Sequence, residues 1–289
     1  MSSPFIWLQH ALPQHGLSKF AGRAAASRRP WLRKRLIERF IRAYDVDMDE
    51  AERRSHEYES FNDFFTRSLK PNARPLADAE RYVLSPADGA VSQLGRIEDG
   101  KIFQAKGHHY TASELLGGDD ELAERFRHGH FATIYLSPRD YHRVHMPVAG
   151  RLTGTTYVPG DLFSVNGATA AAVPGLFARN ERLACVFDTN LGKVASVMVG
   201  AMIVAGIETV WGGRVEPHGK RLLRSVHSTD GEDATSYEAG DEMGRFLLGS
   251  TVVLLFEQDR IEFLPDLADG STVRMGEALA KRLQPKAGA

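Results

Sequence analysis

The sequence predicts an α+β protein, with a helical N-terminal segment followed by a β-rich, mostly antiparallel core. Three observations support this fold class. Apolar and basic residues recur at helical spacing within residues 4–70, Pro71 and Pro75 interrupt that pattern, and beyond them glycine and proline separate short runs rich in Val, Ile, Thr and Phe. We therefore divide the chain into an N-terminal region, residues 1–75, and a core, residues 76–289. With 43% apolar and 25% charged residues among 289, the chain can bury a sizeable core.

The N-terminal segment has the pattern of an amphipathic helix that lies in a membrane interface. Apolar residues recur at helical spacing from Leu32 to Ile41, with arginines and lysines between them. Residues 1–43 hold nine bases and one acid, a net charge of +8, which leaves −9 for residues 44–289. Such a segment suits an anionic membrane surface, although the same periodicity is also typical of a helix packed on the protein's own core. No recognised nucleic-acid-binding motif accompanies the bases, so no nucleic-acid partner is expected.

Nine short runs of the core are predicted to be strands, because β-branched and aromatic residues fill them and turn residues bound them. They are Tyr82–Leu84, Ala90–Ile97, Phe131–Leu136, Leu152–Val158, Leu183–Phe187, Val194–Ile207, Thr209–Val215, Thr251–Phe256 and Ile261–Leu264. Ser113–Phe126 and Gly276–Leu283 are predicted to be helices. No apolar run reaches the roughly 18–20 residues needed to cross a bilayer, and no secretory signal is recognisable. The one cysteine, Cys185, excludes an intramolecular disulfide framework and any multi-cysteine zinc site.

Four segments of the core carry residue types that catalysis uses, although each has an ordinary structural interpretation when it is taken alone. They are Ser85–Gly89, Ser137–Pro147, Leu176–Arg182 and Leu247–Phe256. The first is typical of an Asp-Gly turn, the third of a solvated charged loop, and the fourth of a turn that enters a strand. The second contains His142 and His145, which could ligate a metal, act as acid and base, or form loop hydrogen bonds.

Taken together, the segments supply the parts of a nucleophilic site. Asp88 offers an orienting carboxylate, His145 a base and Ser250 a hydroxyl nucleophile. One alternative is a zinc hydrolase with Asp88, His142 and His145 as ligands, and another is a non-catalytic membrane-binding domain in which these residues only shape turns. The zinc interpretation gives no role to the Gly249-Ser250 step, where glycine leaves the carbonyl beside the serine hydroxyl unobstructed.

The chain resembles the phosphatidylserine decarboxylases, the pyruvoyl-dependent enzymes of phospholipid synthesis, in their bacterial membrane-associated form. The segments that carry the resemblance follow one another in the family's order: Phe64–Lys70 with Arg74-Pro75, Pro86–Gly89, Ser137–Pro147, Leu176–Arg182, and Gly244–Phe246 leading to Leu248–Thr251. The Leu-Gly-Ser-Thr step combined with the two-histidine block is the most specific part of this match. The core is therefore expected to be a decarboxylase core that works beside a membrane.

The resemblance implies that the chain is a zymogen that cleaves itself by serinolysis. The hydroxyl of Ser250 attacks the carbonyl of Gly249, and the precursor separates into a large chain, residues 1–249, and a small chain, residues 250–289. The N-terminus of the small chain becomes a covalent pyruvoyl group, the only cofactor expected, and no metal is expected. This group forms a Schiff base with phosphatidylserine and decarboxylates it to phosphatidylethanolamine and CO2.

The resemblance also assigns roles to individual residues. Asp88, His145 and Ser250 form the relay for self-cleavage, and His142 belongs to decarboxylation or to positioning of the head group. The expected partners are phosphatidylserine in an anionic membrane, the two chains of one precursor, and a second cleaved pair in a homodimer. The expected location is the cytoplasmic face of the cell membrane, as a peripheral protein. A pyruvoyl enzyme acting on a soluble amino acid is the nearest alternative, and the basic N-terminal segment argues against it.

Overall fold

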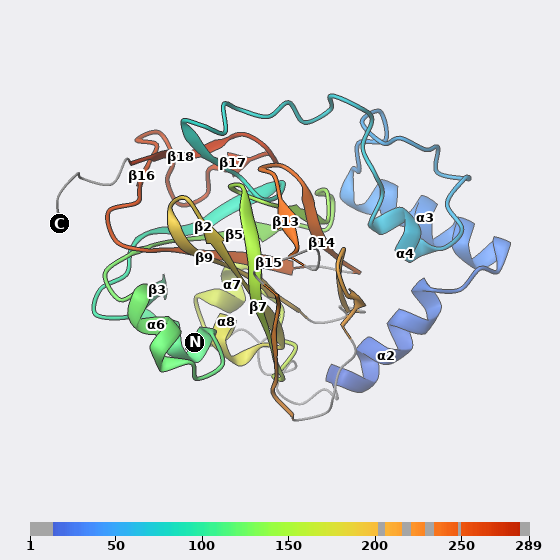
Figure 1. Ribbon diagram of the computed structural model, residues 1–289. Helices are drawn as coiled ribbons and strands as arrows, with labels where there is room; N and C mark the ends of the chain where they lie inside the picture. Colours follow the sequence, from blue (N-terminus) through green and yellow to red (C-terminus); the bar gives the residue numbers. More distant parts are fainter. Residues whose placement is uncertain (1–13, 202–205, 216–220, 229–233, 248–249, 284–289) are drawn as a thin grey trace.

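Antiparallel β-sheet dominates the structure, a computed structural model (Figure 1). It describes residues 14–201, 206–215, 221–228, 234–247 and 250–283. Every pairing between named strands in the described residues is antiparallel. Helices are few, so the predicted α+β class with a mostly antiparallel core is confirmed.

The largest sheet has nine strands. In the order of their pairing they are β12 (Leu223–Val226), β7 (Gly150–Val158), β8 (Arg182–Thr189), β9 (Gly192–Val199), β15 (Ser250–Phe256), β5 (His130–Leu136), β2 (Gly89–Arg96) and β17 (Thr272–Val273), and β13 (Ser236–Tyr237) also pairs with β7. Every residue of β15 is buried. The strand reads as a continuous apolar run because both faces of the sheet are covered at this point.

A four-stranded sheet covers one face of the large sheet. Its strands are β11 (Gly213–Arg214), β10 (Ile207–Thr209), β14 (Glu242–Phe246) and β6 (Arg143–His145). Val144 and Phe246 of this sheet lie in the same buried cluster as Val252 and Leu254 of β15. The even-numbered residues of β15 therefore face the four-stranded sheet, and Ser250 has the same parity.

Short helices and one hairpin cover the opposite face. These elements are β3 (Lys101–Ala105), β4 (His108–Thr111), α5 (Ala112–Leu115), α6 (Asp120–Arg125), α7 (Gly167–Ala170) and α8 (Leu176–Arg179). Their apolar side chains share a second cluster with Val253 and Leu255 of β15. A three-stranded sheet, β1 (Tyr82–Leu84), β18 (Ala278–Arg282) and β16 (Ile261–Phe263), completes the core.

Three helices lie together at one side of this β-rich body (Figure 1). They are α2 (Gln14–Ala25), α3 (Pro30–Tyr44) and α4 (Phe61–Phe65). Ile37 of α3 is buried, and Phe40 packs edge-on against Phe61 and Phe65 of α4. The apolar face of α3 is therefore used inside the protein, as the core-packing interpretation of its periodicity expects. None of the described helices is long and apolar enough to cross a membrane.

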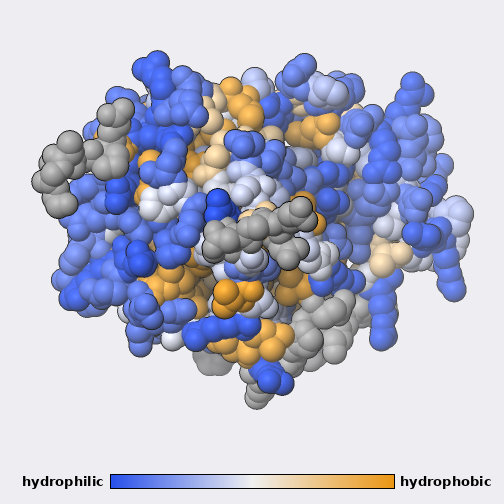
Figure 2. Space-filling model, in the orientation of Figure 1, coloured by the Kyte–Doolittle hydropathy of each residue, from blue (hydrophilic) through white to orange (hydrophobic). Residues whose placement is uncertain are grey.

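The outward face of α3 is strongly basic. Its exposed residues include Trp31, Lys34, Arg35, Arg39 and Arg42. In the space-filling view this side of the molecule is largely hydrophilic (Figure 2). The amphipathic pattern thus separates an apolar face that packs on α4 from a basic face that meets solvent.

Several sequence predictions about individual elements are wrong. Gly276–Leu283 is not a helix, because β18 pairs with β1 and β16 there, and long-range pairing overrides the local preference of Ala, Leu and Lys. Ser113–Phe126 forms two helices, since Gly117 and Gly118 adopt positive φ angles of 79° and 76° and end α5. Residues 45–60, predicted to be helical, are irregular.

Strand predictions fail where the sequence lacks a strand signal or where the chain turns early. The predicted strand Val194–Ile207 stops at Val199, and residues 202–205 lie outside the described residues. Thr209–Val215 contains only the last residue of β10 and the two-residue strand β11. Seven strands were not predicted because they are short: β3, β4, β6, β12, β13, β14 and β17. Charged residues, histidines or glycine also weaken the strand signal of β4, β6, β12 and β14.

Candidate active site

Ser250 is the first residue of the central strand β15, and it is completely buried. It pairs with Leu136 at the end of β5. Its hydroxyl oxygen has no hydrogen-bond partner among the described residues. Buried hydroxyl groups are nearly always hydrogen-bonded, so this orphan group needs an explanation. The predicted cleavage partner, Gly249, lies outside the described residues.

His145 is the last residue of β6, and its imidazole is held at both nitrogens. Nδ1 lies 2.8 Å from the carbonyl oxygen of Gly240, and Nε2 lies 3.1 Å from the hydroxyl of Tyr141. A carbonyl can only accept, so Nδ1 carries the proton and Nε2 accepts from the tyrosine. Burial lowers the pKa of His145. The ring is therefore neutral near pH 7, with its basic lone pair on Nε2.

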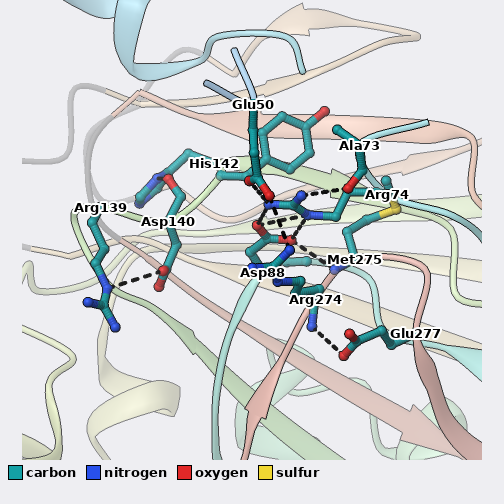
Figure 3. A network of polar contacts seen from close by, with 12 residues as sticks. Glu50, Ala73, Arg74, Asp88, Arg139, Asp140, His142, Arg274, Met275 and Glu277 are labelled. Carbon is teal, nitrogen blue, oxygen red and sulfur yellow. Dashed lines mark hydrogen bonds and ion pairs between the residues drawn. The ribbon is translucent and has the colours of Figure 1, made fainter. Parts of the chain in front are cut away.

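Asp88 stands directly before β2 in a group of ion pairs (Figure 3). The guanidinium of Arg74 donates two hydrogen bonds to the carboxylate of Asp88, from Nε to Oδ1 at 2.9 Å and from Nη2 to Oδ2 at 2.5 Å. The backbone N–H of Met275 also donates to Oδ1, at 2.9 Å. Arg74 binds Glu50 at 2.7 Å as well, and Arg274 binds Glu50 at 3.1 Å. Burial alone lowers the pKa of Arg74, but its hydrogen bonds to Asp88 and Glu50 raise that pKa overall.

Asp88 and His145 are neighbours without a direct bond in the described part of the chain. The N–H of His145 donates to the carbonyl of Pro86 at 2.7 Å, so the strand end and the loop before Asp88 run side by side. Burial lowers the pKa of His145, and the charge of Asp88 opposes this shift. The tautomer of His145 is fixed by Gly240, a partner that sequence reasoning missed because the group involved is a backbone carbonyl.

His142 lies in the loop before β6 and is completely buried. Its Nδ1 donates to the carbonyl of Asp140 at 2.8 Å, and its ring packs on Phe65 with 4.0 Å between centroids. Nε2 has no hydrogen-bond partner among the described residues. Burial lowers the pKa of His142 to about 3. Its carbonyl accepts from the N–H of Phe246 at 3.0 Å, four residues before Ser250.

The segment that follows α4 fastens the N-terminal region to the loop of His142. Ser60 caps α4 by accepting from the N–H of Asp63 at 3.1 Å, so the helix starts there. Nε of Arg143 donates to the carbonyl of Thr66 at 2.9 Å, and Nη2 of Arg67 donates to the carbonyl of Arg139 at 2.9 Å. The N-terminal helices are therefore coupled to the histidine loop through partly buried hydrogen bonds from arginine side chains to backbone carbonyls, which salt screens only weakly.

The charged segment Leu176–Arg182, taken alone as a solvated loop, is not one. Its first residues form α8, and Asn180 and Arg182 are buried. The Arg182 guanidinium donates only to backbone carbonyls, those of Glu114, Leu115, Ala178 and Asn180. This pattern indicates a structural role, in which one side chain satisfies the free carbonyls of several loop and helix ends.

The described residues bring no three His, Cys, Asp or Glu side chains into an arrangement that could hold a metal ion. Asp88 is occupied by Arg74, and both nitrogens of His145 have other partners. The zinc interpretation therefore gains no geometric support from these residues.

Comparison with known proteins gives a match over most of the chain. A family model described as phosphatidylserine decarboxylase matches residues 61–281, and a second model, described as PSD, matches residues 4–45. A phosphatidylserine decarboxylase proenzyme of Saccharophagus degradans is 55% identical over 96% of this chain and 96% of its own length. Proenzymes of the same name from Bordetella bronchiseptica and Pseudomonas aeruginosa are each 56% identical over 96% of this chain, covering 93% and 96% of their own lengths.

Proposed function

The chain belongs to the phosphatidylserine decarboxylase family and is a carboxy-lyase that converts phosphatidylserine to phosphatidylethanolamine and CO2; from this premise we propose that Ser250 starts the maturation of the enzyme and becomes its pyruvoyl group. The observation that carries the proposal is the hydroxyl of Ser250, which is buried at the start of the central strand and has no hydrogen-bond partner within the part of the chain that the structure describes.

The surroundings of Ser250 fit a pyruvoyl group. Oγ leaves with Gly249 and Cβ becomes a methyl group, so an apolar methyl would stand where the buried hydroxyl has no hydrogen-bond partner among the described residues. When present, the group supplies an electrophilic carbonyl that takes up electron density as CO2 leaves. His142 would stand at this site, because its carbonyl is tied to Phe246 just before Ser250 in sequence.

Self-cleavage begins when His145 takes the proton of the Ser250 hydroxyl at Nε2. This requires the hydroxyl of Tyr141 to give up its bond to that nitrogen. The serine oxygen attacks the carbonyl of Gly249, and the amide becomes an ester with a free amine at residue 250. Loss of the Cα proton expels Gly249 as a carboxylate and leaves a dehydroalanine, which tautomerises to an imine and takes up water to release ammonia. Asp88 acts on His145 through its charge, which favours the protonated ring.

The two chains are expected to stay together after cleavage. The small chain begins with β15, which pairs along its length with β5 and β9 of the large chain. Its later strands β17 and β18 pair with β2 and β1. Removing the small chain would leave β5 and β9 without a hydrogen-bonding neighbour and would expose the centre of both apolar clusters to water. Dissociation of the two chains would therefore require the protein to unfold.

His142 serves the second stage, decarboxylation. It is neutral because burial lowers its pKa to about 3, and its free Nε2 can only accept a hydrogen bond. We assign it the task of positioning the head group, by accepting a hydrogen bond from its ammonium at Nε2, and of handling the proton that the former α-carbon takes up once CO2 has left. A neutral ring also leaves the departing carboxylate without a cation that would stabilise the ground state.

The N-terminal region, residues 1–75, would dock the enzyme on the cytoplasmic face of the cell membrane as a peripheral protein. The exposed bases of α3 support this, since they suit anionic lipid such as phosphatidylserine itself. Trp31, 63% exposed at the start of α3, is the kind of residue that anchors at a lipid interface. The helices pack through α4 and Phe65 onto His142, so docking would occur beside the catalytic loop. A homodimer of the cleaved pair is a further expectation of the family resemblance.

Release of CO2 from carboxyl-labelled phosphatidylserine in vesicles tests the proposal. The wild-type protein should release CO2, and the Ser250→Ala variant, folded with the same β-sheet circular dichroism signal, should release none. Free serine should be a poor substrate. Equal activity of the Ser250→Ala variant would contradict the role of Ser250, and equal activity on serine would favour a soluble amino acid as substrate.

A further inference from the structure

Arg67 is a buried cation without an ion-pair partner among the described residues. The residue is 3% exposed, and it follows α4 in the segment that fastens the N-terminal region to the core. Its Nη2 donates to the carbonyl of Arg139 at 2.9 Å and, at a longer 3.5 Å, to that of Asp140. Its Nε and Nη1 have no hydrogen-bond partner in the described structure. The guanidinium carbon lies 5.7 Å from the ring centre of Phe64.

This guanidinium lies beside the ring of His142. The carbonyl of Asp140 accepts from both side chains, from Nδ1 of His142 at 2.8 Å and from Nη2 of Arg67. Figure 3 shows His142 and Asp140 together, next to the ion-pair group of Asp88. The same loop follows β5, whose last residue, Leu136, pairs with Ser250. Arg67, His142 and Ser250 are therefore arranged around one loop.

Several of the buried polar atoms that have no partner in the described structure belong to residues joined to this loop. They are Nε and Nη1 of Arg67, Nε2 of His142 and Oγ of Ser250. A buried cation with unpaired N–H groups loses hydration without replacement, which is costly. The other deeply buried arginine, Arg182, shows that the chain can avoid this cost, because all three of its guanidinium nitrogens donate to backbone carbonyls. Missing partners around one loop indicate a place where a ligand supplies them.

We propose that Arg67 binds the phosphodiester of the substrate head group. The inference rests on the proposed function, because it takes phosphatidylserine as the ligand and His142 as its neighbour. The substrate carries two anionic groups, a phosphodiester and a carboxylate. The carboxylate must lose its charge as CO2, so an arginine bound to it would stabilise the ground state more than the transition state and slow the reaction. The phosphodiester keeps its charge throughout, and the planar fork of a guanidinium matches its oxygens.

The proposal predicts a change in binding rather than in turnover. With monomeric short-chain phosphatidylserine, the Arg67→Gln variant should raise KM about 10- to 100-fold, because charge-assisted hydrogen bonds are lost, while kcat per pyruvoyl group stays within about twofold. The inhibition constant of glycerophosphoethanolamine, a soluble product head group, should rise by the same factor. Arg67→Lys keeps the positive charge but lacks the planar guanidinium. Its KM and inhibition constant should therefore lie between those of the wild-type protein and those of Arg67→Gln. Self-cleavage involves no phosphate and should proceed in both variants.

Lys70→Gln is the matched control, since it removes an exposed positive charge from the same segment and should leave KM and the inhibition constant unchanged. An unchanged KM and inhibition constant in Arg67→Gln would overturn the proposal. A fall in kcat at constant KM would assign Arg67 to positioning the loop instead. If Arg67→Gln fails to fold, Arg67→Lys decides, because wild-type values of KM and the inhibition constant would exclude phosphodiester binding. Absence of CO2 release by the wild-type protein would instead refute the proposed function.

Discussion

Two groups of residues meet at the site, and they differ in how completely their polar atoms are paired. The paired group consists of Glu50, Arg74, Asp88, Arg274 and Met275. Within it, the carboxylate of Asp88 accepts hydrogen bonds from the guanidinium of Arg74 and from the backbone N–H of Met275. The unpaired group consists of Arg67, His142 and Ser250. Each of its members has at least one buried nitrogen or oxygen without a partner among the described residues.

The difference separates structural from chemical roles. A fully paired group is already at its lowest energy in the folded chain, so it holds segments together and fixes charges. This one joins the N-terminal region, the start of β2 and the segment that would become the small chain. An unpaired group keeps a free energy cost that a reaction or a ligand can remove. The unpaired atoms of Arg67, His142 and Ser250 are therefore where we expect a ligand to bind and bonds to be made and broken.

The largest effect is expected from His145→Gln. The amide cannot take the proton of Ser250, so the precursor should remain uncleaved and release no CO2, as gel electrophoresis and a CO2 assay would show. Tyr141→Phe is the control, because it removes only the hydroxyl bound to Nε2 and should still allow cleavage. Complete cleavage of His145→Gln would assign the base to another residue.

His142→Gln should uncouple the two stages. Cleavage should proceed, but decarboxylation should fall about 100- to 10,000-fold, the usual contribution of a positioned proton-transfer group. The measurement is CO2 release divided by the amount of pyruvoyl group, titrated with a hydrazine reagent. Loss of cleavage in His142→Gln would assign His142 to self-cleavage and would contradict its assignment to decarboxylation alone.

Arg74→Gln breaks the paired group. It leaves the carboxylates of Asp88 and Glu50 without their shared cation, and loss of one partner of a buried ion pair costs about 3–5 kcal/mol. Urea unfolding in the uncleaved Ser250→Ala background would measure this loss. Arg274→Gln removes an exposed member of the same group and should cost less than about 1 kcal/mol. An equal loss of unfolding free energy in the two variants would show that the buried ion pairs of Arg74 stabilise the fold no more than the exposed one of Arg274.

The buried His142 should make folding depend on pH. Its pKa is about 3 in the folded chain against 6.5 for the free side chain, so the unfolded chain binds a proton below pH 6.5 that the folded chain does not. Stability is therefore fully present above pH 6.5 and is lost as the pH falls toward 3. In the Ser250→Ala background, His142→Gln should remove about 2 kcal/mol of the stability difference between pH 7 and pH 5. Parallel pH curves with and without His142 would contradict its neutral, buried state.

The smallest effect concerns the outer face of α3. Each exposed base removed, for example by Arg39→Gln, should weaken binding to phosphatidylserine-containing vesicles about fivefold, the equivalent of roughly 1 kcal/mol. Co-sedimentation at fixed salt would measure it. Arg96→Gln in the core, also an exposed arginine, should have no effect. A similar loss in both variants would indicate attraction through net charge alone.

The sequence predicted the central strand and the residue types of the site, because an apolar run and short motifs are local signals. It could not predict the partners that position those residues. Gly240 lies 95 residues from His145 and Met275 lies 187 residues from Asp88, and both act through backbone groups. The strand β18 was missed for a related reason, because it pairs with β1, a segment far away in the sequence. Arg67 stood in a recognised segment, but only its burial shows that its charge is unmatched.

The intact mass of the purified protein under denaturing conditions, measured beside Ser250→Ala, tests the origin of the pyruvoyl group most directly. We predict two chains, residues 1–249 and residues 250–289, with the small chain lighter by one ammonia than simple hydrolysis would give. The variant should remain one chain. A single unmodified chain in freshly folded wild-type protein, or a small chain that keeps the full mass of its serine, would contradict this prediction.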